Sequence, residues 1–268
     1  MRVSSVANLV FLLGSATAAF AQQNDLSGKD QYPQYRVLSG LPGGGFGVLP
    51  SGRPSIDGAA ALATPIGYAL GNHGAIGLFN TTTSLNPFQF DGRNAREQNS
   101  NGTAFFMVGG SYAGFHGTAS YMILSTHLDA AFNFQVSAPL IGRLGLAVGV
   151  QDLDGGGGAA GTGFSLALDR RSSRSVFAVG TYDLGNRAYV SLGVGDRRFR
   201  GAFGNASAPI AGRLRGLVEY DAFNFNGGLL YNMGPFHGLG EHAKGVESNL
   251  FVGLVRAKYA TVGLTFTR

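Results

Sequence analysis

The stretch AAFNFQVSAPL, residues 130–140, decides the fold, because every second residue in it is apolar. The apolar set is Ala130, Phe132, Phe134, Val136, Ala138 and Leu140, and the residues between them include Ala131, Asn133, Gln135 and Ser137. Successive side chains of a β-strand point to opposite faces, so a period of two predicts a strand with one apolar face.

The same alternation recurs along most of the chain. It is clearest in residues 143–151, 162–169 and 259–267, where Val, Leu and Phe alternate with Gly, Thr, Ser and Ala. Further candidate strands are residues 57–64, 73–80, 103–113, 116–124, 174–182, 187–195, 199–207, 213–222, 224–232 and 248–256. The pattern predicts about 12 to 14 strands, the lower number applying if the weak pieces 57–64 and 199–207 are not strands.

The second face of these strands indicates what surrounds them. It carries mostly Gly, Ala, Ser, Asn and Thr, and charged residues make up only 13% of the chain. A soluble β-sandwich presents a charged face to water, whereas the interior of a membrane barrel can be small and polar. We therefore expect an all-β fold, an antiparallel transmembrane β-barrel of about 12 to 14 strands in the cell outer membrane. A soluble β-sandwich or β-solenoid is the alternative.

The N-terminal part of the chain differs from the rest. Residues 1–21 combine Arg2, the apolar stretch VANLVFLLG and a small-x-small end at Ala19 to Ala21, which is typical of a secretory signal peptide. Residues 22–55 are polar and then rich in Gly and Pro, which favours an irregular leader or plug-like segment. We expect residues 56–268 to form the barrel. The chain has no cysteine, so it contains no disulfide.

Several polar residues fall on the lumen face that the alternation defines. In RLRGLVEYDA, residues 213–222, charged residues alternate with Leu214, Val218 and Tyr220. An Arg or Lys on the lipid face costs roughly 2 to 4 kcal/mol near the midplane, so these charges should face the lumen. The candidate lumen-facing polar residues are Arg143, Gln151, Asp169, Arg213, Arg215, Glu219 and Asp221. There they would form an ion-pair ladder that braces the barrel, or a polar constriction for a sugar or ion.

Motifs for enzymatic chemistry are weak in this chain. GGGGAAG, residues 155–161, precedes a predicted strand, whereas a dinucleotide-binding loop precedes a helix. Asp152 and Asp154 supply too few oxygens for calcium, and His237 and His242 have no zinc-site spacing. GGSYAG, residues 109–114, lacks the second Gly and the helix of a hydrolase nucleophile elbow. The sequence therefore predicts no catalytic residue, metal or cofactor.

The formal net charge is +5, but the basic residues are scattered singly between the strands. Without a basic run or helix, we expect no nucleic-acid binding. Scattered arginines suit the phosphate and carboxylate groups of lipopolysaccharide or an anionic glycan, because the guanidinium group pairs with them bidentately. The expected partners are outer-membrane lipid and lipopolysaccharide, and further polysaccharide or other proteins of an exopolysaccharide system.

Three segments resemble the YjbH-like family of outer-membrane proteins associated with exopolysaccharide production. LPSGRPSIDGAAAL, residues 49–62, is similar to the family's leader through Pro50, Ser51, Arg53, Asp57 and Gly58. GVQDLDGGG, residues 149–157, is similar to a family strand that ends in aspartate and glycines. LVEYDAFNFNGGLLY, residues 217–231, is similar to a Glu-Tyr-Asp strand and the Asn-x-Gly strand after it, through Glu219, Tyr220, Asp221, Asn226 and Gly228.

This resemblance implies a location and a process: a non-enzymatic outer-membrane barrel associated with exopolysaccharide production or secretion. Two other hypotheses follow from the residues themselves. One is a general small-solute porin or structural outer-membrane barrel, and the other is a secreted soluble glycan-binding β-protein.

Overall fold

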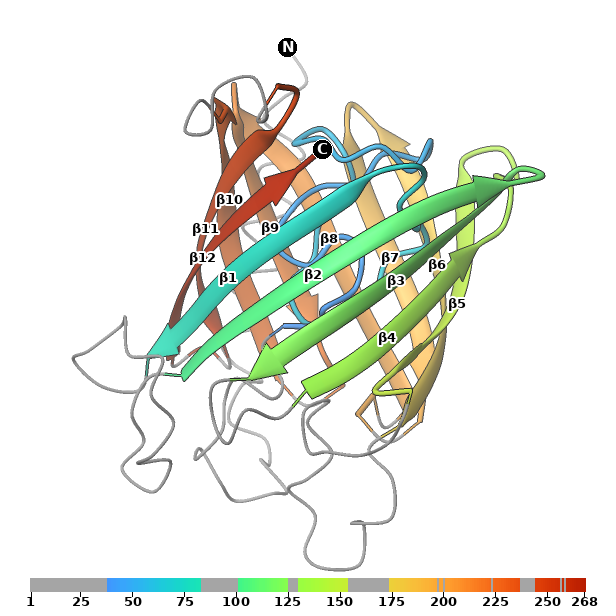
Figure 1. Ribbon diagram of the computed structural model, residues 1–268, viewed down its shortest axis with the longest axis horizontal. Coiled ribbons are helices and arrows are strands. Elements are labelled where there is room, and N and C mark those ends of the chain that lie inside the picture. The colour runs from blue at the N-terminus through green and yellow to red at the C-terminus, as the bar shows by residue number, and fades with distance from the viewer. Residues whose placement is uncertain are drawn as a thin grey trace, which may run out of the picture.

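The computed structural model describes residues 38–82, 101–124, 130–153, 174–196, 198–199, 201–222, 224–236, 244–255, 257 and 259–268. Its strands form one closed antiparallel barrel in which each strand pairs with its neighbours in sequence and β12 pairs with β1 (Figure 1). The strands are β1 (Gly74–Thr82), β2 (Asn101–Tyr112), β3 (Phe115–Leu124), β4 (Ala130–Ser137), β5 (Leu144–Gln151), β6 (Ser175–Gly185), β7 (Ala188–Gly195), β8 (Gly201–Ala211), β9 (Leu214–Tyr220), β10 (Phe225–Pro235), β11 (Glu247–Val255) and β12 (Tyr259–Thr267).

The alternation of apolar and polar residues corresponds to the two faces of this wall. In β4, Phe132 and Phe134 are each 41% exposed on the outside, whereas Asn133 and Gln135 are fully buried inside. Large apolar residues such as Val148, Leu192 and Val252 are exposed on the outside of the other strands. Such an exterior is unfavourable in water and suits hydrocarbon, and a closed strand ladder leaves no backbone group unpaired in lipid. The protein is an outer-membrane β-barrel.

The described residues contain no helix that is long and apolar enough to span a bilayer.

Most of the expected strands are present, including the weak candidate 199–207, which corresponds to β8. The candidate 57–64 is not a strand of the wall, and the candidate 162–169 lies outside the described residues. The wall begins at Gly74, later in the chain than the boundary at residue 56 that the sequence suggested. Residues 58–64 are instead buried inside the barrel, and Asp57 lies at its rim.

The interior of the barrel is occupied by residues 38–72, which we call the lumen segment (Figure 1, blue). It folds back on itself through paired backbone hydrogen bonds between Val48 and Ala59 and a bond from Ser39 N–H to the carbonyl of Leu62. Residues 38–48 and 58–71 are buried throughout. Its apolar side chains, among them Phe46 and Leu62, form a core with Phe79, Phe105 and other inward residues of the wall.

Glycines in the wall make room for this core. The phenyl rings of Phe105, Phe79, Phe177 and Phe203 lie over glycines on the neighbouring strand, at Gly77, Gly263, Gly149 and Gly193 respectively. A Cβ at Gly193 would lie 2.2 Å from Cζ of Phe203, so a larger residue there would require the phenyl ring to shift. These four pairs use four of the chain's 44 Gly and four of its 20 Phe.

The two rims of the barrel differ in the length of their connections. One rim carries two-residue turns at 113–114, 186–187 and 212–213, together with residues 138–143 and 236–246. At the other rim, β1 and β5 end, and the chain continues through residues 83–100 and 152–174 before β2 and β6 begin. Outer-membrane barrels have short periplasmic turns and longer extracellular loops. We infer that the rim with the two-residue turns faces the periplasm, and we call it the short-turn rim.

Candidate functional site

The strongest attachment of the lumen segment to the wall is the carboxylate of Glu219 on β9. Its Oε2 accepts hydrogen bonds from the Leu62 N–H at 2.9 Å, the Thr64 N–H at 3.3 Å and the Thr64 hydroxyl at 2.9 Å. Its Oε1 accepts from the Ala63 N–H at 2.8 Å and from Nδ2 of Asn226 at 2.9 Å. The successive backbone N–H groups form a concave cluster of donors, which stabilises the buried negative charge.

Small polar side chains of the wall continue this attachment around the barrel. Backbone N–H groups of the lumen segment donate to hydroxyl oxygens of the wall at 2.6 to 3.1 Å. The pairs are Ala60 with Ser207, Gly67 with Thr181, Ala69 with Ser137, and Leu70 with Thr118. In the opposite direction, Nε2 of Gln135 donates to the carbonyls of Ile66 and Tyr68. The lumen segment has little secondary structure of its own, so the wall satisfies its buried backbone groups.

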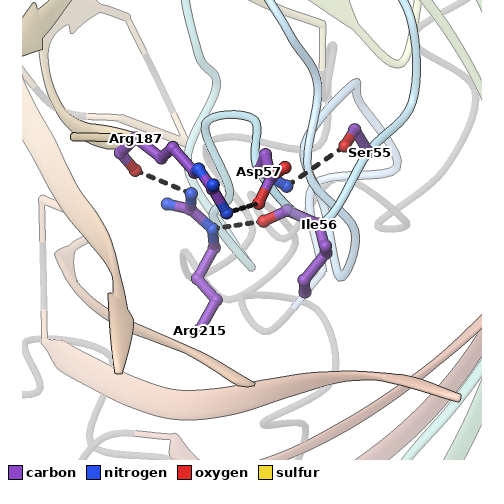
Figure 2. A network of polar contacts seen from close by, with 5 residues as sticks. All are labelled: Ser55, Ile56, Asp57, Arg187 and Arg215. Carbon is purple, nitrogen blue, oxygen red and sulfur yellow. Dashed lines mark hydrogen bonds and ion pairs between the residues drawn. The ribbon is translucent and has the colours of Figure 1, made fainter. Parts of the chain in front are cut away.

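Arg215 on β9 forms a second attachment nearer the short-turn rim (Figure 2). Its guanidinium group donates to the carbonyl of Ile56 at 2.6 Å and to the carbonyl of Arg187 at 2.7 Å. It also donates to the hydroxyl of Ser207 at 3.0 Å. Arg187 in turn pairs with Asp57 of the lumen segment at 3.0 Å, in an exposed position. One buried arginine thus joins the lumen segment, β8 and the turn between β6 and β7.

Four of the predicted lumen residues face the interior. Arg215 and Glu219 bind the lumen segment as described, and Nε2 of Gln151 donates to the carbonyl of Ser39. Asp221 is buried where β9 ends and accepts from the Asn224 N–H and from Nδ2 of Asn226. The predicted residue Asp169 lies outside the described residues.

Two predicted lumen residues lie in exposed turns and not in the lumen. Arg143 and Arg213 each come directly before a strand, in turns of the short-turn rim, and both are exposed. Arg143 contacts Asp183 at 3.6 Å instead of facing the lumen. Alternation fixes the direction of a side chain only within a strand, and both residues fall one position before the strand begins.

The opposite charges of β9 do not form the expected ion-pair ladder. Arg215 and Glu219 are four residues apart, which places them about 13 Å apart along the strand. Each is bonded to a different part of the lumen segment instead. A further wall residue, Asn205, donates from Nδ2 to the hydroxyl oxygen of Thr64 at 2.9 Å. Ser207, Thr181 and Asn205 were not predicted as contacts, although all three are buried. Their inward position in the alternation was the available signal, but Ser, Thr and Asn are too common in strands to single them out.

A polar pocket of about 410 Å³ opens at the short-turn rim, and we call it the rim pocket. Its inner side is a turn of the lumen segment that includes Arg53 and Ser55, and the ends of β10, β11 and β12 form the remaining walls. The residues that line it are Arg53, Pro54, Ser55, Ile56, His73, Asn232, Gly245, Glu247, Asn249, Thr267 and Arg268.

Outside the rim pocket, the described residues offer few side chains arranged for metal binding or catalysis. In the part of the chain that the structure describes, no three His, Asp or Glu side chains are grouped as metal ligands would be. Ser111 of the GGSYAG motif lies 2.8 Å from Nδ1 of His116, in an exposed cross-strand pair at the end of β2. Ser111 is on a strand, so this pair lacks the sharp strand-to-helix turn that presents a hydrolase nucleophile.

No protein-family model and no curated protein matches this chain. Among solved structures, a KdgM porin is similar over 72% of this chain and 97% of its own, with 10% identity and a TM-score of 0.44. An outer-membrane channel from Pseudomonas putida F1 is similar over 77% of this chain and 96% of its own, with 11% identity and a TM-score of 0.40. A mutant porin of Rhodopseudomonas blastica is similar over 62% of this chain and 54% of its own, with 13% identity and a TM-score of 0.34. At these identities the similarity concerns the fold alone.

Proposed function

We propose that this outer-membrane barrel is non-enzymatic and serves the production or secretion of an extracellular polysaccharide, with its lumen segment as part of the working protein. The observation that carries the proposal is a contact between two of the segments that resemble the YjbH-like family. Residues 49–62 belong to the lumen segment and residues 217–231 to the wall, and they meet where the Leu62 N–H donates to Glu219.

This contact gives a physical role to residues that carry the resemblance to the family. Glu219 binds the lumen segment, and Nδ2 of Asn226, from the same family-like segment, donates to Oε1 of Glu219 at 2.9 Å. Asp57, from the leader-like segment, pairs with Arg187 at the short-turn rim. Residues that are far apart in the sequence and similar to one family therefore act together in holding the lumen segment in the barrel.

The porin alternative requires a continuous path of water through the barrel. Residues 38–48 and 58–71 of the lumen segment are buried in that space and hydrogen-bonded to the wall. We therefore expect the intact protein to show no steady ion conductance in planar lipid bilayers. A permanently open conductance would contradict this expectation and favour a small-solute porin.

Deletion of the gene in its host tests the proposed process. We expect secreted polysaccharide to fall strongly, and wild-type protein supplied in trans to restore it. Outer-membrane integrity, measured by resistance to detergent and leakage of periplasmic enzymes, should be unchanged and serves as the control. Normal polysaccharide secretion in the deletion strain would contradict the proposal.

A further inference from the structure

The rim pocket combines two kinds of polar group that a ligand could use together. Arg53 and Arg268 supply guanidinium groups, His73 supplies an imidazole, and Glu247 is the residue of the lining with a side-chain carboxylate. Asn249, Ser55 and Thr267 add an amide and two hydroxyl groups. The volume of about 410 Å³ falls within the range of roughly 300 to 1,000 Å³ that small-molecule sites occupy. A single small anion would leave most of this space and these groups unused.

The two arginines of the rim pocket are available to a ligand. Arg53 and Arg268 are both exposed, and among the described residues neither guanidinium group forms an ion pair. Arg187 and Arg143 at the same rim are instead paired with Asp57 and Asp183. Unpaired guanidinium groups that line one pocket favour a ligand with a carboxylate or phosphate, since the planar fork binds such groups bidentately.

Backbone hydrogen bonds hold the main chain of both arginines in place. Arg268 exchanges two backbone hydrogen bonds with Gly74, at 2.9 and 3.0 Å, which continue the β1–β12 ladder. The carbonyl of Arg53 accepts from the Leu49 N–H at 2.9 Å, which closes the turn of the lumen segment. The lumen segment and the wall thus each supply one guanidinium group from an ordered stretch of backbone. Little backbone entropy remains to be lost when a ligand binds.

Three other polar side chains of the pocket are hydrogen-bonded to one another. Nδ2 of Asn232 donates to Oε2 of Glu247 and to Oδ1 of Asn249, both at 3.0 Å. These bonds orient Asn249 so that its amide nitrogen is left as a donor, and Glu247 keeps acceptor capacity on its exposed carboxylate. An amide donor next to a carboxylate acceptor suits a ligand with several hydroxyl groups.

We propose that the rim pocket binds an acidic saccharide, with a uronic acid carboxylate on Arg53 and Arg268 and sugar hydroxyls on Glu247 and Asn249. This inference rests on the proposed function and names the chemistry of the polymer. The short-turn rim faces the periplasm, so the pocket meets the saccharide on the side from which it is exported.

Binding to the purified full-length protein in detergent micelles tests the inference. The probes are a disaccharide of glucuronic acid and glucose, the same disaccharide with glucose in place of glucuronic acid, and inorganic phosphate. We expect the acidic disaccharide to bind more tightly than the neutral one, and the double variant R53Q/R268Q to lose about tenfold or more of that affinity. R143Q, which removes one arginine at the same rim outside the pocket, should bind as the wild type does. Raising the salt concentration should weaken binding.

Three results would overturn the inference. They are equal affinity for the acidic and neutral disaccharides, unchanged affinity in the double variant, and complete competition by phosphate at the concentration of the disaccharide. A heat-modifiable band on gels verifies that the double variant is folded.

The same variant separates this inference from the proposed function. If deletion abolishes polysaccharide secretion but R53Q/R268Q restores it fully, the pocket inference fails and the proposed function stands. If deletion leaves secretion unchanged, the proposed function fails whatever the pocket binds.

Discussion

Glu219 illustrates how a single residue can hold an irregular segment inside a barrel. A buried carboxylate normally requires a cation beside it, yet the contacts of Glu219 are backbone N–H groups, one hydroxyl and one amide. The donors of Leu62, Ala63 and Thr64 follow one another along the chain and converge on its two oxygens. A hydroxyl or an amide at position 219 would offer fewer acceptor sites to these donors.

The variant E219A should therefore loosen the lumen segment. It leaves three backbone N–H groups without their acceptor, at about 1 to 3 kcal/mol for each buried group left unsatisfied. We expect the free energy of unfolding to fall by at least about 2 kcal/mol, and hydrogen exchange at residues 62–64 to become much faster than in the wall. The control E247A removes an exposed carboxylate that accepts one hydrogen bond in the wall, from Asn232, and should cost less than about 1 kcal/mol. Equal losses in the two variants would show that Glu219 has no special role.

The direction in which residues point could be predicted here, but their partners could not. Alternation within β9 correctly gave the inward position of Arg215 and Glu219, because that information is local. The Leu62 donor lies 157 positions from Glu219 in the sequence, and no local pattern connects the two. Arg143 and Arg213 show the limit of the same reasoning, since the alternation ends where the strand ends.

At the scale of elements, the lumen segment differs from the strands around it in the kind of hydrogen bond that holds it. The strands hold each other through backbone ladders, whereas many of the bonds between the lumen segment and the wall join a backbone group to a side chain. Residues 57–64 resembled a strand because residues 58–63 are small and apolar, and such residues also suit the buried interior of the barrel. The strands themselves were predictable, because the lumen and the lipid require different residues on their two faces.

Engineered cysteines can verify the position of the lumen segment. The Ala60 N–H donates to the hydroxyl of Ser207 at 3.1 Å, so cysteines at these two positions should be close enough to form a disulfide. The chain has no cysteine of its own, so any disulfide in A60C/S207C comes from the introduced pair. We expect nearly complete crosslinking in outer membranes, measured by the mass of the linked peptides.

The control pair for this experiment is A60C/A206C. Ala206 is the neighbour of Ser207 on β8 and lies on the outward face, so the wall separates it from Ala60. We expect no crosslink in this pair. Equal crosslinking of both pairs, or of neither, would contradict the described position of the lumen segment.

The pairing of glycine and phenylalanine across strands gives a second prediction at this scale. An alanine Cβ at Gly193 would lie 2.2 Å from the ring of Phe203, and 2.8 Å from the carbonyl oxygen of Ala178. G193A should lower the free energy of unfolding by roughly 1 to 3 kcal/mol, the cost of overpacking. At Gly110 a Cβ would meet no atom within 4 Å, so G110A should leave the free energy of unfolding unchanged. Chemical denaturation of both variants measures the two values. A neutral G193A would show that the ring has room to move.

At the scale of the whole molecule, the barrel reverses the usual distribution of polarity. Its wall buries Asn133, Gln135 and Thr181 against the lumen segment and exposes leucine, valine and phenylalanine around its circumference. In water such a surface would associate with other molecules, whereas in hydrocarbon it is the stable arrangement. The free energy of folding should therefore depend on the membrane, and a charge placed on the exterior should measure that dependence.

The variant L192R places such a charge halfway along β7, at a residue that is 71% exposed. Because an arginine near the bilayer midplane costs about 2 to 4 kcal/mol, folding into phospholipid vesicles should become less favourable by that amount. Tyr112 at the end of β2 is 86% exposed but lies at the rim, so Y112R should cost only about 0 to 1 kcal/mol. Reversible denaturation from vesicles measures both values. Two small and equal costs would mean that the exposed leucines and valines meet water, and the difference between the two variants therefore tests the depth at which the barrel lies in lipid.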